Sequence, residues 1–574
     1  MPADHMSLEK EQQMKSSPSG LVRGLLGRSW PLLTSSLVAG LVAGFSSTGL
    51  LALTNSALQE GASGPVALTF AGLCLLVLVS GIGADILSLR LEQRSVFELR
   101  LWLSHCILRA PYRQLQRVGR HRLLATLTED IANISKAFEA TSYLCIDGAI
   151  LLGCLVYAAW LSWPLFLGVT AFLLFGVVSF YIPQRKALEW LRRARESGDA
   201  LFHDFRALTE GAKELKMNHD RRHDFLQNQL RATADRVRHQ FNRGWTIYLI
   251  AAHWGKLLFY VLLGLLLFAL PAIHEVSHAV LTGFVLTVLF MLTPLTVVLT
   301  SVPDIGRGVV GGKKIHALGL VLAEKGDEDH AIDTKNAVNP VKLELLGVVH
   351  AYQDEREQHN FTLGPIDLVI EPGELLFVTG GNGSGKTTLA LLIAGLYAPE
   401  KGEIRLNGQL ITEANREGYR QHFSAVFSDP YVFESLLGAA DNDDTLKQAD
   451  HLLVRMQLDH KVRIQGHRFS SVELSQGQRK RLALLAAYLE DRPFCLFDEW
   501  AADQDPHFKD MFYTELVPQL KACGKTVIVI THDEQYYHVA DRCVRLISGR
   551  LAPFPAIDVR DDGHAMRLAS DTGY

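Results

Sequence analysis

The sequence predicts a membrane domain of six α-helical spans fused to an α/β domain that carries a phosphate-binding loop. Three observations predict this fold class. Six apolar stretches occur before residue 302, the loops between them are either very basic or free of Lys and Arg, and a Gly-rich turn in the C-terminal half joins an apolar strand to a helix. The hydrophobic content of 48% and the mean hydropathy of +0.12 are high for a soluble protein of 574 residues.

Each apolar stretch approaches the length of about twenty residues that crosses a hydrocarbon core. The stretches run approximately over Trp30–Leu53, Val66–Leu87, Tyr143–Leu161, Trp163–Ile182, Ile247–Leu270 and Val280–Thr300. Three connections, at Asn55–Pro65, Ser162–Pro164 and Ala272–His278, contain no Lys or Arg, whereas the two long connections are rich in both. Because basic loops stay in the cytoplasm, both termini and the two long loops are expected there.

The two long loops show leucine and phenylalanine at three- and four-residue intervals among charged residues. This spacing is typical of amphipathic helices, so the membrane helices should continue into the cytoplasm. We expect the mid-loop segments Glu129–Ser135 and Phe205–Glu214 to contact the C-terminal domain. The basic residues of these loops are expected to fix the membrane topology, and the net charge of -4 gives no reason to expect a nucleic-acid partner.

The segment after the sixth span is polar and contains Pro340, which is typical of a linker. The stretch that follows it, VKLELLGVVHAY, alternates as an exposed edge strand does. These features divide the chain into an N-terminal segment (residues 1–29), a transmembrane domain (30–320), a linker (321–342), an α/β domain (343–552) and a C-terminal tail (553–574).

The α/β domain contains the motif FVTGGNGSGKTTLALLIAGL, whose Gly-x-x-x-x-Gly-Lys-Thr core fits the P-loop pattern. In such a loop the backbone N–H groups and the N-terminus of the following helix face phosphate groups. Lys386 is expected to reach the β- and γ-phosphates of ATP, and Thr387 to bind Mg²⁺. The expected phosphate-binding residues are Gly380, Gly381, Asn382, Gly383, Ser384, Gly385, Lys386, Thr387 and Thr388.

Two further apolar strands end in candidate catalytic residues. The segment RPFCLFDEW places Asp498 and Glu499 directly after one strand, and TVIVITHD places His532 after another. Buried parallel strands present ligand-binding residues at their C-terminal ends. We expect Asp498 to bind Mg²⁺ through water and Glu499 to act as a general base on the attacking water. His532 is expected to contact the γ-phosphate and orient that water.

Two ionisable residues, His253 and Lys256, lie well inside the fifth span. Residues three apart on a helix are neighbours on one face. A lysine near the middle of a membrane is unfavourable by about 2.5 to 3.5 kcal/mol on insertion scales. We therefore expect both residues to line a cavity for cargo, and an internal ion pair of Lys256 with Asp85 or Asp147 is the alternative.

The seven cysteines are scattered and form no C-x-x-C pair or metal-type spacing, so neither a disulfide framework nor a zinc site is expected. The first thirty or so residues are polar, and the apolar run after them is followed by more such runs. A cleaved secretory signal is therefore not expected.

The segment LSQGQRKRLALL resembles the signature loop of the ABC transporter ATPases, with Gln476 where glycine is commoner. The resemblance covers essentially the whole chain and implies an exporter-type membrane domain. It also implies a composite ATP site, in which the signature loop of one subunit closes over ATP held by the P-loop of the other. The ATP-binding residues that it implies are Tyr352, then Ser475, Gly477 and Gln478 of the signature loop, and Asp505 of the D-loop. Tyr352 matches the aromatic residue that stacks on adenine, and a buried tyrosine at a strand end is the alternative. In the family pattern Glu499 matches the catalytic base and His532 the switch histidine.

One position departs from the family pattern. The Q-loop glutamine should fall within SAVFSDPYVF, where this sequence has Ser428 followed by Asp429. We hypothesise that Asp429 supports the bound Mg²⁺, directly or through Ser428. The alternative is that Asp429 is an ordinary turn residue before Pro430.

The strings FSAVFSDPYVF, LSQGQRKR and DEWAADQDPHF resemble a narrower group, the bacterial cyclic-peptide exporters, whose members carry microcins, lipopeptide toxins and peptide siderophores or their precursors. One membrane domain and one ATPase domain make half a transporter, so a homodimer in the bacterial inner membrane is expected. The resemblance implies ATP-driven export of a modified or cyclic peptide, including a peptide siderophore or its precursor.

Three alternatives to peptide export are an exporter-fold siderophore importer, a lipid flippase and a non-transporting regulator with an inactive ATPase. The regulator is disfavoured because the sequence keeps every residue type that hydrolysis needs, namely Lys386, Asp498, Glu499 and His532.

Overall fold

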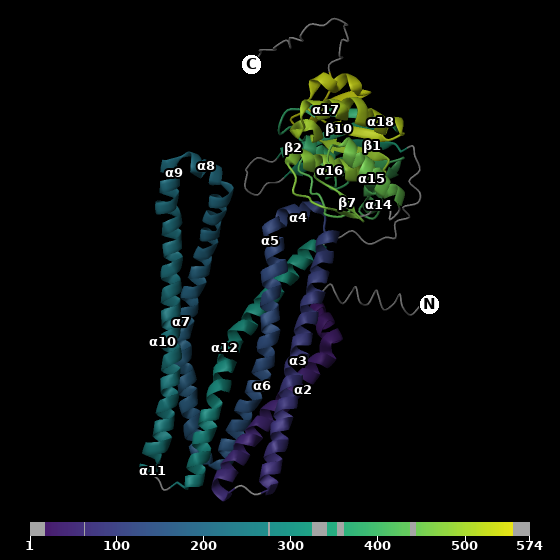
Figure 1. The fold of residues 1–574 in the computed structure, drawn as a ribbon. Coiled ribbons are helices and arrows are strands. Elements are labelled where there is room, and N and C mark those ends of the chain that lie inside the picture. The colour runs from purple at the N-terminus through teal and green to yellow at the C-terminus, as the bar shows by residue number, and fades with distance from the viewer. Residues whose placement is uncertain are drawn as a thin grey trace, which may run out of the picture. The chain divides into compact units, whose positions relative to one another are not determined.

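The structure, a computed structural model, describes residues 18–61, 64–273, 276–323, 341–352, 361–436 and 443–554. The chain folds into two compact units, and Figure 1 labels many of their elements. The membrane unit comprises Met1–Ser104 and Leu123–Leu318, and the α/β unit comprises His105–Arg122 and Gly319–Tyr574. Most of the predicted linker and C-terminal tail lies outside the described residues.

Long helices joined by short ones build the membrane unit. They are α2 (Pro18–Glu60), α3 (Gly64–Arg109), α5 (Arg120–Ala125), α6 (Ile131–Leu161), α7 (Trp163–Glu210), α8 (Ala212–Met217), α9 (His219–Asp224), α10 (Arg231–Gly264), α11 (Leu270–Ile273) and α12 (His278–Ala323), with π-helical turns at Thr126–Asp130, Phe225–Leu230 and Leu265–Ala269. Within the described part of the chain, six helical segments are long and apolar enough to cross a membrane. This finding confirms the six predicted spans.

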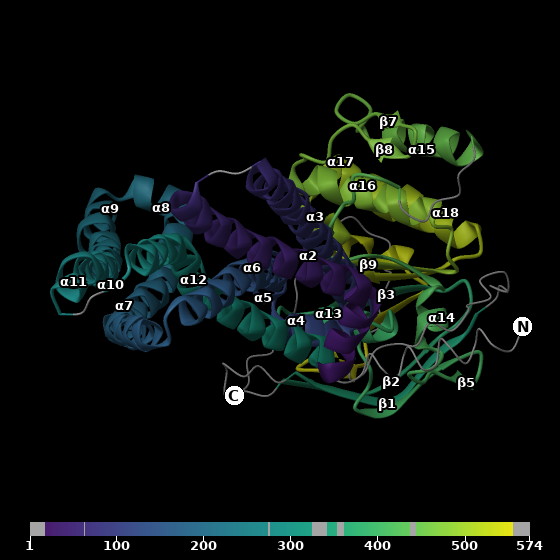
Figure 2. The same ribbon diagram turned by 90° about the horizontal axis from the view of Figure 1, so that it is seen from below.

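Helices α7 and α10 run side by side over most of their length (Figures 1 and 2). Their close approach depends on Gly244, because a Cβ atom there would lie 2.8 Å from the Leu191 side chain. The indole N–H of Trp254 also donates a hydrogen bond to Ser179 Oγ at 2.7 Å. With 48 residues and a rise of 1.5 Å per residue, α7 is about 72 Å long, far more than a bilayer core of roughly 30 Å requires. The loop periodicity had predicted this extension.

The α/β unit contains three sheets. A six-stranded sheet has the order β12-β11-β3-β10-β9-β6, a four-stranded sheet has the order β2-β1-β4-β5, and β7 pairs with β8. The strands are β1 (Leu343–Tyr352), β2 (Phe361–Ile370), β3 (Leu375–Gly380), β4 (Lys401–Leu406), β5 (Gln409–Leu410), β6 (Phe423–Val426), β7 (Ile464–Gln465), β8 (Arg468–Phe469), β9 (Phe494–Asp498), β10 (Thr526–Ile530), β11 (Arg542–Ile547) and β12 (Arg550–Ala552).

The helices of the α/β unit are α13 (Lys386–Ile393), α14 (Arg416–Arg420), α15 (Asp443–Arg455), α16 (Gln476–Leu489), α17 (Pro506–Met511) and α18 (Val517–Ala522), with shorter turns at Trp500–Asp503, Phe512–Leu516 and Glu534–Val539. Helices α13, α16 and α18 contact strands of the six-stranded sheet. Strands β3, β9 and β10 are parallel neighbours and almost wholly buried. Alternate residues enter opposite cores: Phe497 and Val529 face one, and Leu496 and Ile530 face the other. Burial of both faces explains the continuous apolar runs of these strands.

The prediction that VKLELLGVVHAY forms an edge strand is wrong. This segment becomes β1, which lies inside the four-stranded sheet between β2 and β4. Its alternation reflects one buried and one more exposed face, a pattern that edge and interior strands share.

Helix α4 (Tyr112–Val118) lies in the first long loop and packs within the α/β unit (Figure 1). The Arg113 guanidinium pairs with Glu400 at 2.9 Å and donates to the Ala351 carbonyl at 3.0 Å. The Tyr397 hydroxyl donates to the Gln116 side chain. A segment of the membrane-region sequence is therefore tied to the end of β1.

The segment Glu129–Ser135 makes its described side-chain contacts inside the membrane unit. Asp130 pairs with Lys314 at 3.7 Å, and the Ser135 hydroxyl donates to Glu92. The loop residues Arg113 and Gln116, which bond to the α/β unit, lie earlier in the loop, and the contact of Glu129–Ser135 with the α/β unit stays a prediction.

Candidate functional site

The P-loop connects β3 to α13, as predicted. Gly380, Gly383 and Gly385 have φ angles of 149°, 75° and 101°, which L side chains rarely adopt. Gly385 is also the N-cap of α13, so the backbone N–H groups of the first helical turn face the loop. The loop and helix therefore form a site that favours a phosphate group.

Lys386 is 5% exposed and folds back over this loop. Its Nζ donates to the carbonyl oxygens of Gly380 and Gly381 at 3.0 and 3.1 Å. The same Nζ lies 3.6 Å from Glu499 Oε1. The ammonium group is thus held between the phosphate loop and the candidate base.

The structure brings Glu499 and His532 together. His532 Nε2 lies 3.0 Å from Glu499 Oε1, because the parallel strands β9 and β10 end side by side. Glu499 has a left-handed backbone with φ 48° and ψ 38°, which is uncommon for a residue other than glycine. This pair can accept a proton from a water molecule and hold that water in one orientation.

The buried carboxylate of Asp498 is suited to bind a hydrated divalent cation. The residue is 0% exposed, and neither carboxylate oxygen has a hydrogen-bond partner among the described residues. Burial raises the pKa of Asp498, and the nearby Thr387 hydroxyl and Lys386 ammonium offset this shift only in part. A charged group buried with so little compensation is costly, and a cation with its bound water would compensate it.

The signature loop begins α16, where Ser475 and Gln478 form a capping box. A Cβ atom on Gly477 would lie 2.7 Å from the Asp503 carbonyl oxygen, so the close approach of these two segments requires glycine. In the part of the chain that the structure describes, the signature residues bond to the turn after Glu499 and not to the P-loop. The two halves of the expected ATP site are therefore not assembled within one chain.

The remaining predicted residues are placed as follows. Tyr352 is the last residue of β1, and its side chain is outside the described residues. Asp505 is the N-cap of α17, where it accepts a hydrogen bond from the Phe508 N–H and lies 3.4 Å from Arg481. Asp429 is exposed, and within the described residues it has no hydrogen bond or ion pair.

The sequence analysis did not predict that Lys480 is buried beside Glu499 or that Arg113 bonds to the end of β1. Lys480 lies on the same face of α16 as Leu484 and Ala487, which are buried with it. Lys480 precedes these two apolar residues by four and seven positions, and this helical spacing could have predicted that the lysine is buried. No comparable signal distinguishes Arg113 from other juxtamembrane arginines.

Comparisons with known proteins agree with this geometry. The ABC transporter profile matches residues 363–502, and the ABC transporter transmembrane region matches residues 29–206. The "ATP-binding protein SyrD" of Pseudomonas syringae pv. syringae is 35% identical over 94% of this chain and 97% of its own length. The chain belongs to the ABC transporter family.

This ABC transporter also resembles more distant relatives. The "ATP-dependent lipid A-core flippase" of Dechloromonas aromatica is 24% identical over 95% of this chain and 94% of its own length. The "Macrolide export ATP-binding/permease protein MacB" of a Shewanella species is 28% identical, but over only 36% of this chain and 33% of its own length. Family membership and six spans show a multi-pass protein of the bacterial inner membrane, with a cytoplasmic domain that binds ATP and couples its hydrolysis to transport.

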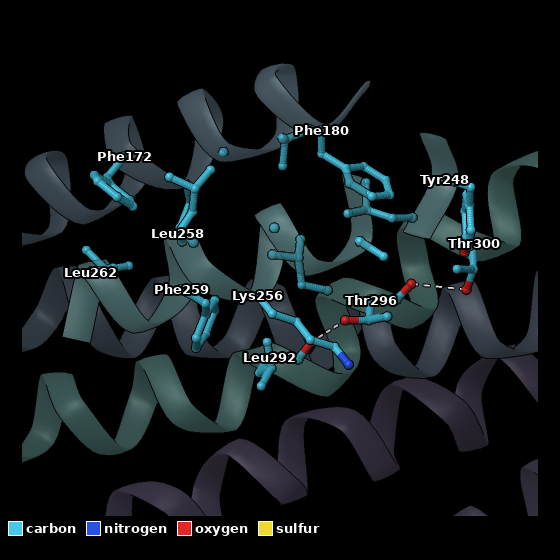
Figure 3. A pocket seen from close by; sticks show the side chains of 17 residues that line it. Phe172, Phe180, Tyr248, Lys256, Leu258, Phe259, Leu262, Leu292, Thr296 and Thr300 are labelled. Carbon is cyan, nitrogen blue, oxygen red and sulfur yellow. Dashed lines mark hydrogen bonds between the residues drawn. The ribbon is translucent and has the colours of Figure 1, made fainter. Parts of the chain in front are cut away.

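The membrane unit of this ABC transporter has a pocket of about 120 Å³ between α7, α10 and α12 (Figure 3). Most of its lining is apolar, including Phe172, Leu258 and Leu292. Lys256 lines the pocket and lies near Thr296, whereas His253 does not line it. The described residues form no ion pair between Lys256 and either Asp85 or Asp147.

The role of Asp429 can be tested in the ATPase reaction. If this carboxylate supports Mg²⁺, Asp429→Ala should raise the Mg²⁺ concentration needed for half-maximal hydrolysis, because one oxygen ligand or one partner of a metal-bound water is lost. The measurement is a Mg²⁺ titration of ATPase activity with purified protein. Asp459→Ala, which removes another exposed carboxylate of the α/β unit, is the matched control. Identical titrations for both variants would make Asp429 an ordinary turn residue.

Proposed function

We propose that this ABC transporter works as a homodimer that exports a modified or cyclic peptide with an apolar portion and an acidic group, from cytoplasm to periplasm. The pocket in the membrane unit carries this proposal, because it offers mostly apolar side chains and one lysine without an ion pair among the described residues. An apolar surface buries the acyl or aromatic portion of such a cargo, and the ammonium group attracts its carboxylate.

The threonines of the pocket support this assignment. Thr296 and Thr300 donate to the backbone oxygens of Leu292 and Thr296 at 2.8 and 3.0 Å, as the dashed lines in Figure 3 mark. Each hydroxyl oxygen keeps its capacity to accept a hydrogen bond. The Tyr248 side chain adds a further polar group at the same end. The polar groups of the pocket therefore suit the amide N–H groups of a peptide.

A homodimer is proposed because each chain carries one P-loop and one signature loop that do not meet within it. Two copies in head-to-tail contact of these loops would form two ATP sites. Thr387 and Asp498 would hold Mg²⁺, which neutralises charge on the phosphates when it is bound. Lys386 would bind the β- and γ-phosphates, and Glu499 would take the proton of the attacking water.

Export follows from differential binding of ATP to two states of the dimer. ATP that binds more tightly to the closed pair of ATPase domains shifts the membrane domains toward an outward-open state, and hydrolysis reverses the shift. Helix α4 supports this coupling, because its Arg113 bonds to the carbonyl of Ala351, the neighbour of the adenine-stacking Tyr352. Peptide siderophores and their precursors belong to the proposed cargo class.

The direct experiment compares the secreted and intracellular metabolites of a deletion strain with those of its parent. A peptide that disappears from the medium and is retained in the cells supports the proposal. ATP-dependent uptake of that peptide into inside-out vesicles tests the direction. An unchanged peptide profile with lipid A-core retained in the inner leaflet would favour the flippase that the lipid A-core relatives suggest. Uptake into right-side-out vesicles would favour the siderophore importer.

Lys256→Met should abolish cargo-stimulated ATPase activity, because the pocket loses the cation that attracts the acidic group. The measurement is the ratio of cargo-stimulated to basal hydrolysis in proteoliposomes. Lys256→Arg keeps the charge and should restore at least part of the stimulation. Lys136→Met, which removes an exposed lysine of α6 outside the predicted span, should keep the full ratio. Early melting of Lys256→Met with unchanged export per folded molecule would contradict a role in cargo binding.

A further inference from the structure

A buried lysine lies directly beneath the candidate catalytic base. Lys480, in the second turn of α16, is 1% exposed. Its Nζ donates to the Glu499 carbonyl oxygen at 2.8 Å and pairs with Asp503 Oδ2 at 2.6 Å. Lysine is almost never fully buried unless such partners are present. The site described above leaves this cation without a role.

The hydrogen bond from Lys480 is accepted by Glu499, a residue whose backbone conformation is uncommon. Glu499 adopts the left-handed region, which persists in a residue other than glycine only where its surroundings hold it. Its N–H donates to the Ile530 carbonyl at 3.1 Å, and its own carbonyl accepts from Lys480 and, at 3.3 Å, from the Ala502 N–H. The peptide groups on both sides of Glu499 are therefore fixed, and with them the direction of its side chain.

One hydrogen bond holds the Lys480 backbone, and two more join the segments on either side of its side chain. The indole N–H of Trp500, a residue that is 1% exposed, donates to the Lys480 carbonyl at 2.8 Å. Gln476 donates to the Asp503 carboxylate at 3.1 Å, and the Gln504 side chain donates to the Gly477 carbonyl at 3.0 Å. The start of α16 and the turn at Trp500–Asp503 thus form one hydrogen-bonded block around the ammonium group.

We propose that Lys480 is a positioning residue for ATP hydrolysis: its ammonium group holds the Glu499 backbone so that the carboxylate meets the attacking water and His532. This inference rests on the proposed role of Glu499 as general base. Lys480 does not contact the substrate and acts only through Glu499. It also links Glu499 to the signature residues at the start of α16, which in the proposed homodimer face the ATP of the partner.

The test measures ATP hydrolysis and ATP binding by the purified full-length Lys480→Met protein. Methionine keeps the length of the lysine side chain and removes its charge. A displaced base should lower kcat by about 10- to 100-fold, because small misplacements of a catalytic group have effects of this size. The Kd of a fluorescent ATP analogue should stay within about threefold of wild type, since Lys480 contacts no phosphate-binding residue. Lys525→Met is the matched control, because Lys525 is also buried and paired, with Asp491 at 2.7 Å, at the opposite end of β10. We expect it to keep a normal kcat.

A double variant separates positioning from a general loss of stability. If Lys480 acts through Glu499, Lys480→Met should cause no further loss of hydrolysis in the Glu499→Gln background. An equal loss in both backgrounds would overturn the proposal, as would a folded Lys480→Met protein with kcat within about twofold of wild type. Near-normal hydrolysis by Glu499→Gln alone would instead disprove the base that the inference rests on, so the two failures are distinguishable.

Discussion

Glu499→Gln is expected to lower kcat for ATP hydrolysis by roughly 100-fold or more, within the range for a positioned acid or base. In the proposed reaction the water oxygen bonds to the γ-phosphorus while the bond from that phosphorus to the bridging oxygen breaks, and Glu499 takes a proton from the water. Glutamine keeps the size of the side chain but cannot accept this proton at neutral pH. The structure places the carboxylate 3.0 Å from His532 Nε2 and 3.6 Å from Lys386 Nζ, where an attacking water can be held.

The measurement is single-turnover and steady-state hydrolysis with purified protein, together with ATP binding. Binding should persist, because the phosphate loop is unchanged. Glu515→Gln, which alters a glutamate outside the site, should leave both quantities normal. Wild-type turnover by a folded Glu499→Gln protein would show that another group accepts the proton.

The second large effect concerns a site shared between two copies. Lys386→Ala removes the cation that binds the phosphates, and Ser475→Arg places a bulky cation in the signature loop. Each homodimer should lose hydrolysis by roughly 100-fold or more, because both of its sites lack one essential half. A mixed dimer of the two variants keeps one complete site, formed by the P-loop of one copy and the signature loop of the other.

Mixed dimers can be isolated with two affinity tags and compared with the two homodimers. Hydrolysis by the mixed dimer well above that of either homodimer is the expected result. The same tags on two wild-type copies control for the purification. If either variant homodimer hydrolyses ATP normally, or if mixing restores nothing, the ATP site does not have the proposed shared geometry.

The placement of the candidate catalytic residues was predictable because it follows from strand order. Apolar strands that precede Asp498 and His532 had to be buried, and parallel neighbours must end at the same edge of the sheet. Span number was equally predictable, since the cost of crossing a bilayer constrains length and composition together.

Other features depend on packing between segments far apart in the sequence. The alternation of β1 fits an edge or an interior strand, so its neighbours β2 and β4 could not be inferred from it. The contact of Arg113 with Glu400 joins positions that share no local pattern. A lysine such as Lys480 is usually solvated, and only the docking of α16 against the turn after Glu499 buries it.

The great length of α7 has a mechanical consequence. A rigid rod of about 72 Å that tilts by roughly 10° about one end moves its other end by about 12 Å. Because α10 is packed along α7, the two helices would swing as one lever. A small rotation at the loop end of this lever would therefore be amplified into a displacement of its membrane end about as wide as a helix.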